Sequence, residues 1–136
     1  MSSVQFLQDK KHWLHYYFSV FGKMCYDCDS TNKKKFKKTF NNIWTIIHSM
    51  TFQLEDDISE NQELSILVYG FFNADIKSIP CMNCRNHYIQ YLAQHPIAYV
   101  KNNLDLQKWA VDFHNAVNIR HGKNIFSFSN AKNLYS

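Results

Sequence analysis

Glycine and proline are scarce in this sequence. Three glycines and two prolines among 136 residues are too few for the closely spaced turns of a β-sandwich or β-barrel. No stretch approaches the ~20 consecutive apolar residues that cross a bilayer, so no membrane span is expected. The N-terminal residues also lack the basic and apolar segments of a signal peptide. These absences predict a protein that stays in the compartment where it is made.

The excess of positive charge is small as well. A net charge of +4 does not by itself indicate a nucleic-acid-binding protein, because binding to a phosphate backbone needs several clustered cations. The five lysines between positions 33 and 38 are most simply the solvated start of a helix. We therefore expect no nucleic-acid partner.

Apolar residues recur at every third or fourth position along most of the chain. This is the pattern of helices that bury one face. The predicted helices cover residues 4–24, about 36–50, a stretch from about Gln62 to Ile79–Pro80, a stretch from about Cys81 to His95–Pro96, and Leu104–Arg120, with a short last turn near Leu134. Ser59 and Gln62 predict a capping box for the third helix, and Gly122 predicts a C-cap for the fifth. The sequence thus predicts an all-α protein, a four-helix bundle with an extra N-terminal helix.

The four cysteines form two CxxC pairs, Cys25–Cys28 and Cys81–Cys84. In a chain without a secretion signal, such pairs indicate redox or metal sites before structural disulfides. Pro80 places Cys81 at the start of a helix, where unpaired N–H groups and the helix dipole favour a thiolate. A disulfide between two cysteines on one turn is then readily exchanged.

Other uses of the four cysteines remain open at this point. Zinc ribbons separate their CxxC pairs by roughly 15–20 residues and place them on glycine-rich hairpins. Here residues 29–80 and two predicted helices lie between the pairs, which disfavours zinc without forbidding it. A thioredoxin-like fold would need a βαβ pattern around Cys81, and none is present. A non-catalytic four-cysteine zinc-binding or interaction module is therefore the alternative to a redox enzyme.

Three motifs follow one another in a specific order. Trp44 and His48 form a WxxxH, Pro80–Cys84 a PCxxC, and His114–Lys123 an HNxVNxxxGK with Trp109 five residues ahead. This order resembles the ERV/ALR family of FAD-linked sulfhydryl oxidases, from about residue 36 to residue 130. The resemblance implies an enzyme that oxidises protein dithiols to disulfides through a CxxC and FAD, reduces O2 to H2O2, and forms a homodimer. It also divides the chain into an N-terminal extension with a CxxC, residues 1–35, and an FAD-binding domain, residues 36–136.

The resemblance also implies roles for individual residues. Cys81 and Cys84 would be catalytic, with Cys84 against the flavin ring and Cys81 facing incoming thiols, and no metal ligands are expected. The cofactor-binding residues would be Trp44, His48 and His87 at the flavin, and Trp109, His114, Asn115, Val117, Asn118, Arg120 and Lys123 towards the adenine and the phosphates. Taken singly, Trp44 and Trp109 would each suit a core position. The pair Cys25–Cys28 would be either a shuttle that collects electrons from substrates or a structural pair that fixes the N-terminal helix.

Two positions depart from the family pattern. Cellular members commonly carry a Cys-x16-Cys disulfide, where this chain has Val111 and Phe128, and we expect these two side chains to pack together instead. An arginine usual three residues before the first tryptophan is Asn41 here, with Lys37 or Lys38 as substitutes. The lack of the bridge and of a targeting segment resembles the compact viral members, which implies a cytoplasmic protein, in the host cytoplasm or the virion of a large DNA virus.

Overall fold

The computed structural model describes residues 2–24 and 33–136. Every regular element in these residues is helical, which confirms the all-α prediction. The helices are α1 (Ser3–Met24), α2 (Lys33–Phe52), α3 (Gln62–Gly70), α4 (Met82–Gln94), α5 (Asn103–Arg120) and α6 (Phe128–Tyr135). The expected helices therefore exist, with ends that differ by a few residues.

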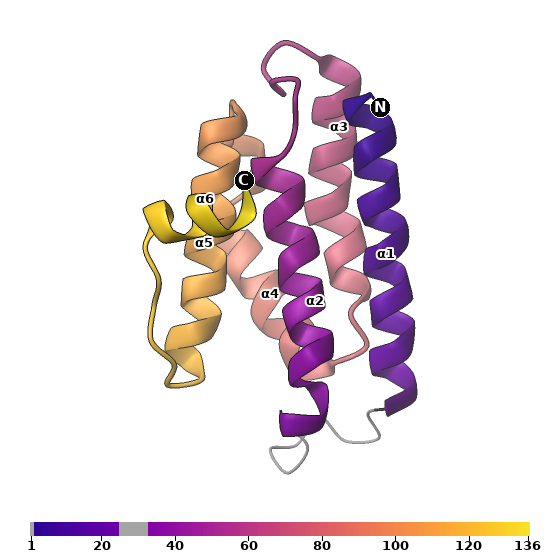
Figure 1. Ribbon diagram of the computed structural model, residues 1–136, viewed down its shortest axis with the longest axis vertical. Coiled ribbons are helices and arrows are strands. Elements are labelled where there is room, and N and C mark those ends of the chain that lie inside the picture. Colours follow the sequence, from indigo (N-terminus) through magenta and orange to yellow (C-terminus); the bar gives the residue numbers. More distant parts are fainter. Residues whose placement is uncertain (1, 25–32) are drawn as a thin grey trace.

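The long helices run side by side, and α2 lies at the centre of the bundle (Figure 1). It contacts α1 on one side and α5 and α6 on the other, while α1 also contacts α3. The short α6 crosses in front of α5 near the C-terminus (Figure 1). This arrangement makes α2 the element that links the extra N-terminal helix to the C-terminal part of the chain.

The face of α1 that meets the bundle is apolar beyond its first turn, where Ser3 is buried. Leu7, Leu14, Phe18 and Phe21 recur at helical spacing and are all buried in the one hydrophobic core. On the same helix His15 Nε2 lies 2.9 Å from the Asp75 carboxylate, beyond the end of α3. The N-terminal helix is therefore packed as a core element of the described structure.

The backbone after α3 departs from regular α-helical geometry before it reaches the second CxxC. A π-helical turn, Phe71–Asp75, is followed by a 3₁₀ turn, Ile76–Ser78. A π-helical turn leaves carbonyl groups without their usual helical partners. The buried Tyr88 hydroxyl of α4 donates to the Phe72 carbonyl at 2.6 Å, and this bond ties α4 to the irregular turn.

Two predicted helix ends were wrong in detail, and one was right. The N-cap of α3 is Asn61, whose side chain accepts from the Leu64 N–H at 3.0 Å, because Ser59 is engaged with Asp57 instead. The last turn near Leu134 is a complete helix, α6, capped by Ser127. Gly122 has a φ of 69°, which confirms it as the residue that ends α5.

Candidate functional site

A cluster of flat rings forms where α2 meets α5. Trp44 and His48 lie one helical turn apart and therefore share a face of α2. The His114 ring of α5 stacks on Trp44, with centroids 3.7 Å apart and planes 7° apart. His48 Nε2 lies 2.8 Å from His114 Nδ1. The structure thus brings together three of the predicted cofactor residues from two of the motifs.

The C-terminal segment closes one side of this cluster. The Tyr135 ring of α6 stacks on His48 at 4.6 Å, and Phe126 meets both histidines edge-on. The Gln53 side chain, just past the end of α2, donates to the Tyr135 carbonyl at 2.9 Å. Tyr135 was missed from the sequence, because its distance from the other motifs follows no helical spacing. Phe126 lies close to a motif, since it is the third residue after Lys123 of the HNxVNxxxGK.

The two histidines are held in the neutral form. Burial, and secondarily the neighbouring His114, lowers the pKa of His48 to about 3. Burial, and secondarily the positive charge of Lys123, lowers the pKa of His114 to about 4. One ring donates its N–H to the other at neutral pH. Within the described part of the chain, the buried Nδ1 of His48 has no hydrogen-bond partner.

The asparagines of the third motif shape the turn after α5. The Asn115 side chain accepts from the Phe126 N–H at 3.1 Å and donates to the Phe126 carbonyl at 2.8 Å. Asn118 is buried, and its carbonyl accepts from the Lys123 N–H at 2.8 Å. We name this set of bonds, made by Asn115 and Asn118 to residues 123 and 126, the α5 clasp. It fixes the segment that carries Phe126 against the histidine pair.

The remaining predicted residues of α5 lie in different surroundings. Val117 is half-buried against the core, whereas Arg120 and Lys123 are exposed at the end of the helix. Trp109 is buried, and its indole N–H donates to the His95 carbonyl at 2.9 Å. Phe113 connects Trp109 to Trp44, with centroids 5.8 Å and 5.2 Å away. Trp109 thus sits in the aromatic core behind the ring cluster.

The second CxxC starts α4, as its proline predicted. Cys81 is the N-cap, and its Sγ accepts from the Cys84 N–H at 3.3 Å. Cys84, Tyr88 and Tyr91 recur at i, i+4 and i+7 and so share a face of α4. Both tyrosine rings pack on Phe113, at 4.9 Å and 5.3 Å. Cys84 therefore belongs to the face of α4 that leads to Trp44.

The two cysteines of this pair differ in exposure. Cys81 is buried with 2% of its surface exposed, whereas Cys84 is half-buried. A Cβ placed on Gly22, near the end of α1, would lie 3.4 Å from the Pro80 ring. The end of α1 therefore lies beside the residue that precedes Cys81. Cys25 and Cys28 lie outside the described residues, and His87 is exposed on α4.

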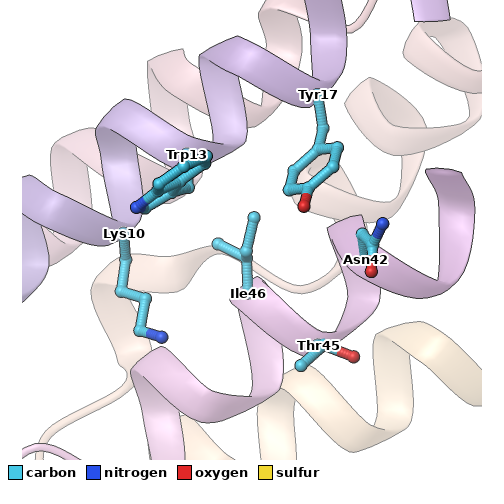
Figure 2. Close-up of a pocket in the computed structure, with 6 residues that line it drawn as sticks. All are labelled: Lys10, Trp13, Tyr17, Asn42, Thr45 and Ile46. Atoms are coloured by element: carbon cyan, nitrogen blue, oxygen red, sulfur yellow. The ribbon is translucent and has the colours of Figure 1, made fainter. Parts of the chain in front are cut away.

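A shallow groove elsewhere carries none of the predicted site residues. Figure 2 shows it between two helices, lined by Lys10, Trp13 and Tyr17 of α1 and Asn42, Thr45 and Ile46 of α2. Across the described ranges, no three His, Cys, Asp or Glu side chains gather as a metal ion would require. Nor does any helix in those ranges combine the length and apolar character that spanning a bilayer needs.

The ring cluster fits a flat heteroaromatic cofactor with an anionic tail. Trp44 and the two histidines are rings of the kind that stack on a heterocycle, although in this structure His114 lies on Trp44 and Tyr135 on His48. His48 Nδ1 is a buried polar atom without a partner among the described residues, and a heterocycle can satisfy it. The charge of Lys123 reaches His114, so the same end of the site is electropositive. These three properties together match a dinucleotide such as FAD.

Comparison with known proteins agrees with these motifs. The model of the Erv1 / Alr family matches residues 41–136, more than half of the chain. A "FAD-linked sulfhydryl oxidase" of African swine fever virus (isolate Warthog/Namibia/Wart80/1980) is 45% identical over 60 residues, which are 44% of this chain and 50% of that protein. "Probable FAD-linked sulfhydryl oxidase R368" of Acanthamoeba polyphaga mimivirus is 31% identical over 90 residues, 65% of this chain and 62% of that protein. The chain thus spans about half the length of the swine fever virus relatives that it matches. No solved structure matches it significantly.

Proposed function

Because this chain belongs to the Erv1 / Alr family, we propose that it is an FAD-dependent sulfhydryl oxidase. It would convert protein dithiols to disulfides and reduce O2 to H2O2. The observation that carries the proposal is the shared face of α4, on which Cys84 precedes two tyrosines that pack on Phe113, whose ring in turn contacts Trp44. A redox-active pair at a helix start and a ring cluster are thereby built into one core.

The cysteine pair would carry the exchange steps. A substrate thiolate attacks one sulfur of the Cys81–Cys84 disulfide, and the other sulfur leaves as a thiolate. The second substrate thiolate then attacks the mixed disulfide, which releases the oxidised substrate and leaves Cys81 and Cys84 reduced. The N-terminal end of α4 stabilises the thiolate that forms in each step. The chemistry that FAD supplies when bound is acceptance of two electrons from a dithiol and their transfer to O2.

The chain's own residues would hold the cofactor. Trp44, His48 and His114 would provide stacking faces and the buried Nδ1, while Asn118 and Lys123 would serve the phosphate end. Trp109 is buried, so it would lie behind the site and support the residues that contact the cofactor. Asn115 is hydrogen-bonded to Phe126 and would likewise act indirectly. His87, Val117 and Arg120 remain proposed contacts on the family resemblance alone.

The test is the spectrum of the purified protein. We expect flavin absorbance near 450 nm that bleaches when dithiothreitol is added without oxygen and returns when air is admitted. Replacing Cys84 by Ser should keep the bound flavin and abolish the bleaching, because the ring cluster is untouched. A colourless protein that carries zinc instead would support the non-catalytic module and reject the oxidase.

We further propose that Cys25 and Cys28 deliver electrons to the Cys81–Cys84 pair. Gly22 lies against Pro80, and only two residues of the sequence separate Gly22 from Cys25. Replacing both cysteines by Ser should slow oxidation of a reduced unfolded protein but spare oxidation of dithiothreitol. Unchanged rates with both substrates would leave only the structural role of this pair.

The proposal also covers the oligomeric state of the protein and its location in the cell. The family resemblance supports a homodimer, for which sedimentation at micromolar concentration is the measurement. The viral relatives support a cytoplasmic site of action, in the host cytoplasm or the virion. Fractionation of producing cells would test this assignment.

A further inference from the structure

Arg85 places a positive charge at the N-terminal end of its helix. It occupies the first turn of α4, directly after Cys84, where the helix dipole is positive and a cation is unfavourable. From Ile79 to Val100 it is the only lysine, arginine, aspartate or glutamate in the sequence. A lone positive charge placed against the dipole needs a local reason, such as a negative charge beside it.

The structure anchors this side chain close to the cysteine pair. The half-buried guanidinium donates to the Ile79 carbonyl through Nε at 3.3 Å and through Nη2 at 3.1 Å. Ile79 ends the 3₁₀ turn, and Pro80 is the only residue between it and Cys81. Arg85 thereby bridges the backbone before Cys81 and the helical turn that carries Cys84.

We propose that Arg85 is a positioning residue of the redox pair, which holds the Ile79–Cys81 turn and favours the thiolate of the Cys81–Cys84 pair through its charge. This inference rests on the proposed oxidase function for its purpose, but its physical content concerns the two thiols alone. When the disulfide is attacked, one sulfur leaves as an anion, and a nearby fixed cation stabilises that anion.

The reactivity of the reduced thiols tests the proposal. The full chain carrying Cys25→Ser and Cys28→Ser, as purified, is reduced without oxygen, and its alkylation rate by iodoacetamide is followed from pH 5 to pH 10. The more reactive thiol should show a pKa below the ordinary value of about 8.5. A value at or above about 8.5 would overturn the proposal without any further variant.

Two replacements separate the charge from the hydrogen bonds. Arg85→Gln keeps an N–H donor for the Ile79 carbonyl but removes the charge, so the thiol pKa should rise by about one unit. Alkylation at pH 6 should then slow about tenfold. Arg85→Lys keeps the charge and should retain most of the rate. Equal rates for Arg85→Gln and the parent, or an Arg85→Lys variant as slow as Arg85→Gln, would refute the electrostatic role.

Lys101→Met is the matched control. This exposed lysine also donates to a backbone carbonyl, that of Ala98, but lies outside α4. Its removal should leave the thiol pKa unchanged. Because alkylation is read with or without flavin in the sample, a failure of this proposal is distinguishable from a protein that binds no FAD.

Discussion

At the scale of single residues, the His48–His114 contact stands out because both rings are held neutral. His48 has no exposed surface, and its Nδ1 lacks a partner within the described residues. A buried imidazole resists protonation because the charged form loses its hydration. The folded protein therefore binds fewer protons at mildly acidic pH than the unfolded chain does.

The stability of the protein should consequently fall below about pH 6.5. Both folded pKa values are lowered, so the unfolded chain takes up protons on these rings between pH 6.5 and about 4 while the folded protein does not. Each group lowers the free energy of unfolding by at most about 1.4 kcal/mol per pH unit in that window. Urea unfolding at pH 7, 6 and 5 measures the slope. His48→Leu should make the free energy of unfolding depend less steeply on pH, because one of the two titrating rings is gone. An identical slope in parent and variant would contradict this account.

Motifs identified some of these residues, and packing determined the rest. The WxxxH spacing places Trp44 and His48 on one helical face, which the sequence could predict. The stacking of His114 on Trp44 depends on how α5 packs against α2, which no local pattern encodes. Trp109 illustrates the same limit, because its motif position indicated a cofactor contact and its surroundings are those of a core residue.

At the scale of elements, the α5 clasp joins α5 to the segment that precedes α6. Val111 is buried, and the Phe128 ring packs on Phe52 at 5.7 Å, while the expected contact between Val111 and Phe128 stays a prediction. The two hydrogen bonds between Asn115 and the backbone of Phe126 join α5 to the segment before α6. A polar connection thus holds α6 over the histidines.

Asn115→Ala should loosen α6. The backbone groups of Phe126 lose their partner, and the free energy of unfolding should fall by about 1–3 kcal/mol. Tyr135 should then cover His48 less completely, so amide hydrogen exchange in residues 126–136 should accelerate more than in α2. Asn133→Ala, at an exposed position of α6, is the control and should change neither quantity. Equal protection of α6 in both variants would show that the clasp is not what holds it.

Helix positions were predictable from periodicity, whereas helix ends depended on competing caps. Ser59 and Asn61 both suit a helix start, and the Asp57 carboxylate decides between them by accepting from Ser59. The helix α6 was underestimated because it is only eight residues long, so its pattern covers about two turns. Only Ala131 is buried in it, while Tyr135 gains its place from His48.

At the scale of the whole molecule, helices α1 to α5 share one core. The division at residue 35 stays a prediction, but α1 contributes four fully packed side chains to the same cluster as α2 and α3. Burial of each is worth about 1.5–3 kcal/mol. Their sum, about 6–12 kcal/mol, is comparable to the roughly 5–15 kcal/mol that typically separates a folded domain from its unfolded chain.

A chain that starts at residue 36 should therefore not form a stable monomer. Loss of α1 uncovers Phe40, whose ring packs on Phe21, and Ile46, which lines the groove with α1, so we expect aggregation or a non-cooperative thermal transition. Circular dichroism melting and light scattering measure both. A cooperative transition at the parent's midpoint would show that residues 36–136 are an independent domain.

The place of Tyr135 also matters to anyone who handles the protein. Its carbonyl is bound by Gln53 and its ring lies on His48, so the backbone leaves residue 136 directly beside the histidine pair. An affinity tag or fluorescent fusion attached after Ser136 would crowd that spot and disturb the stacking of Tyr135 on His48. The amino end, where Ser3 caps the loop at Asp56, is the better attachment point for such additions.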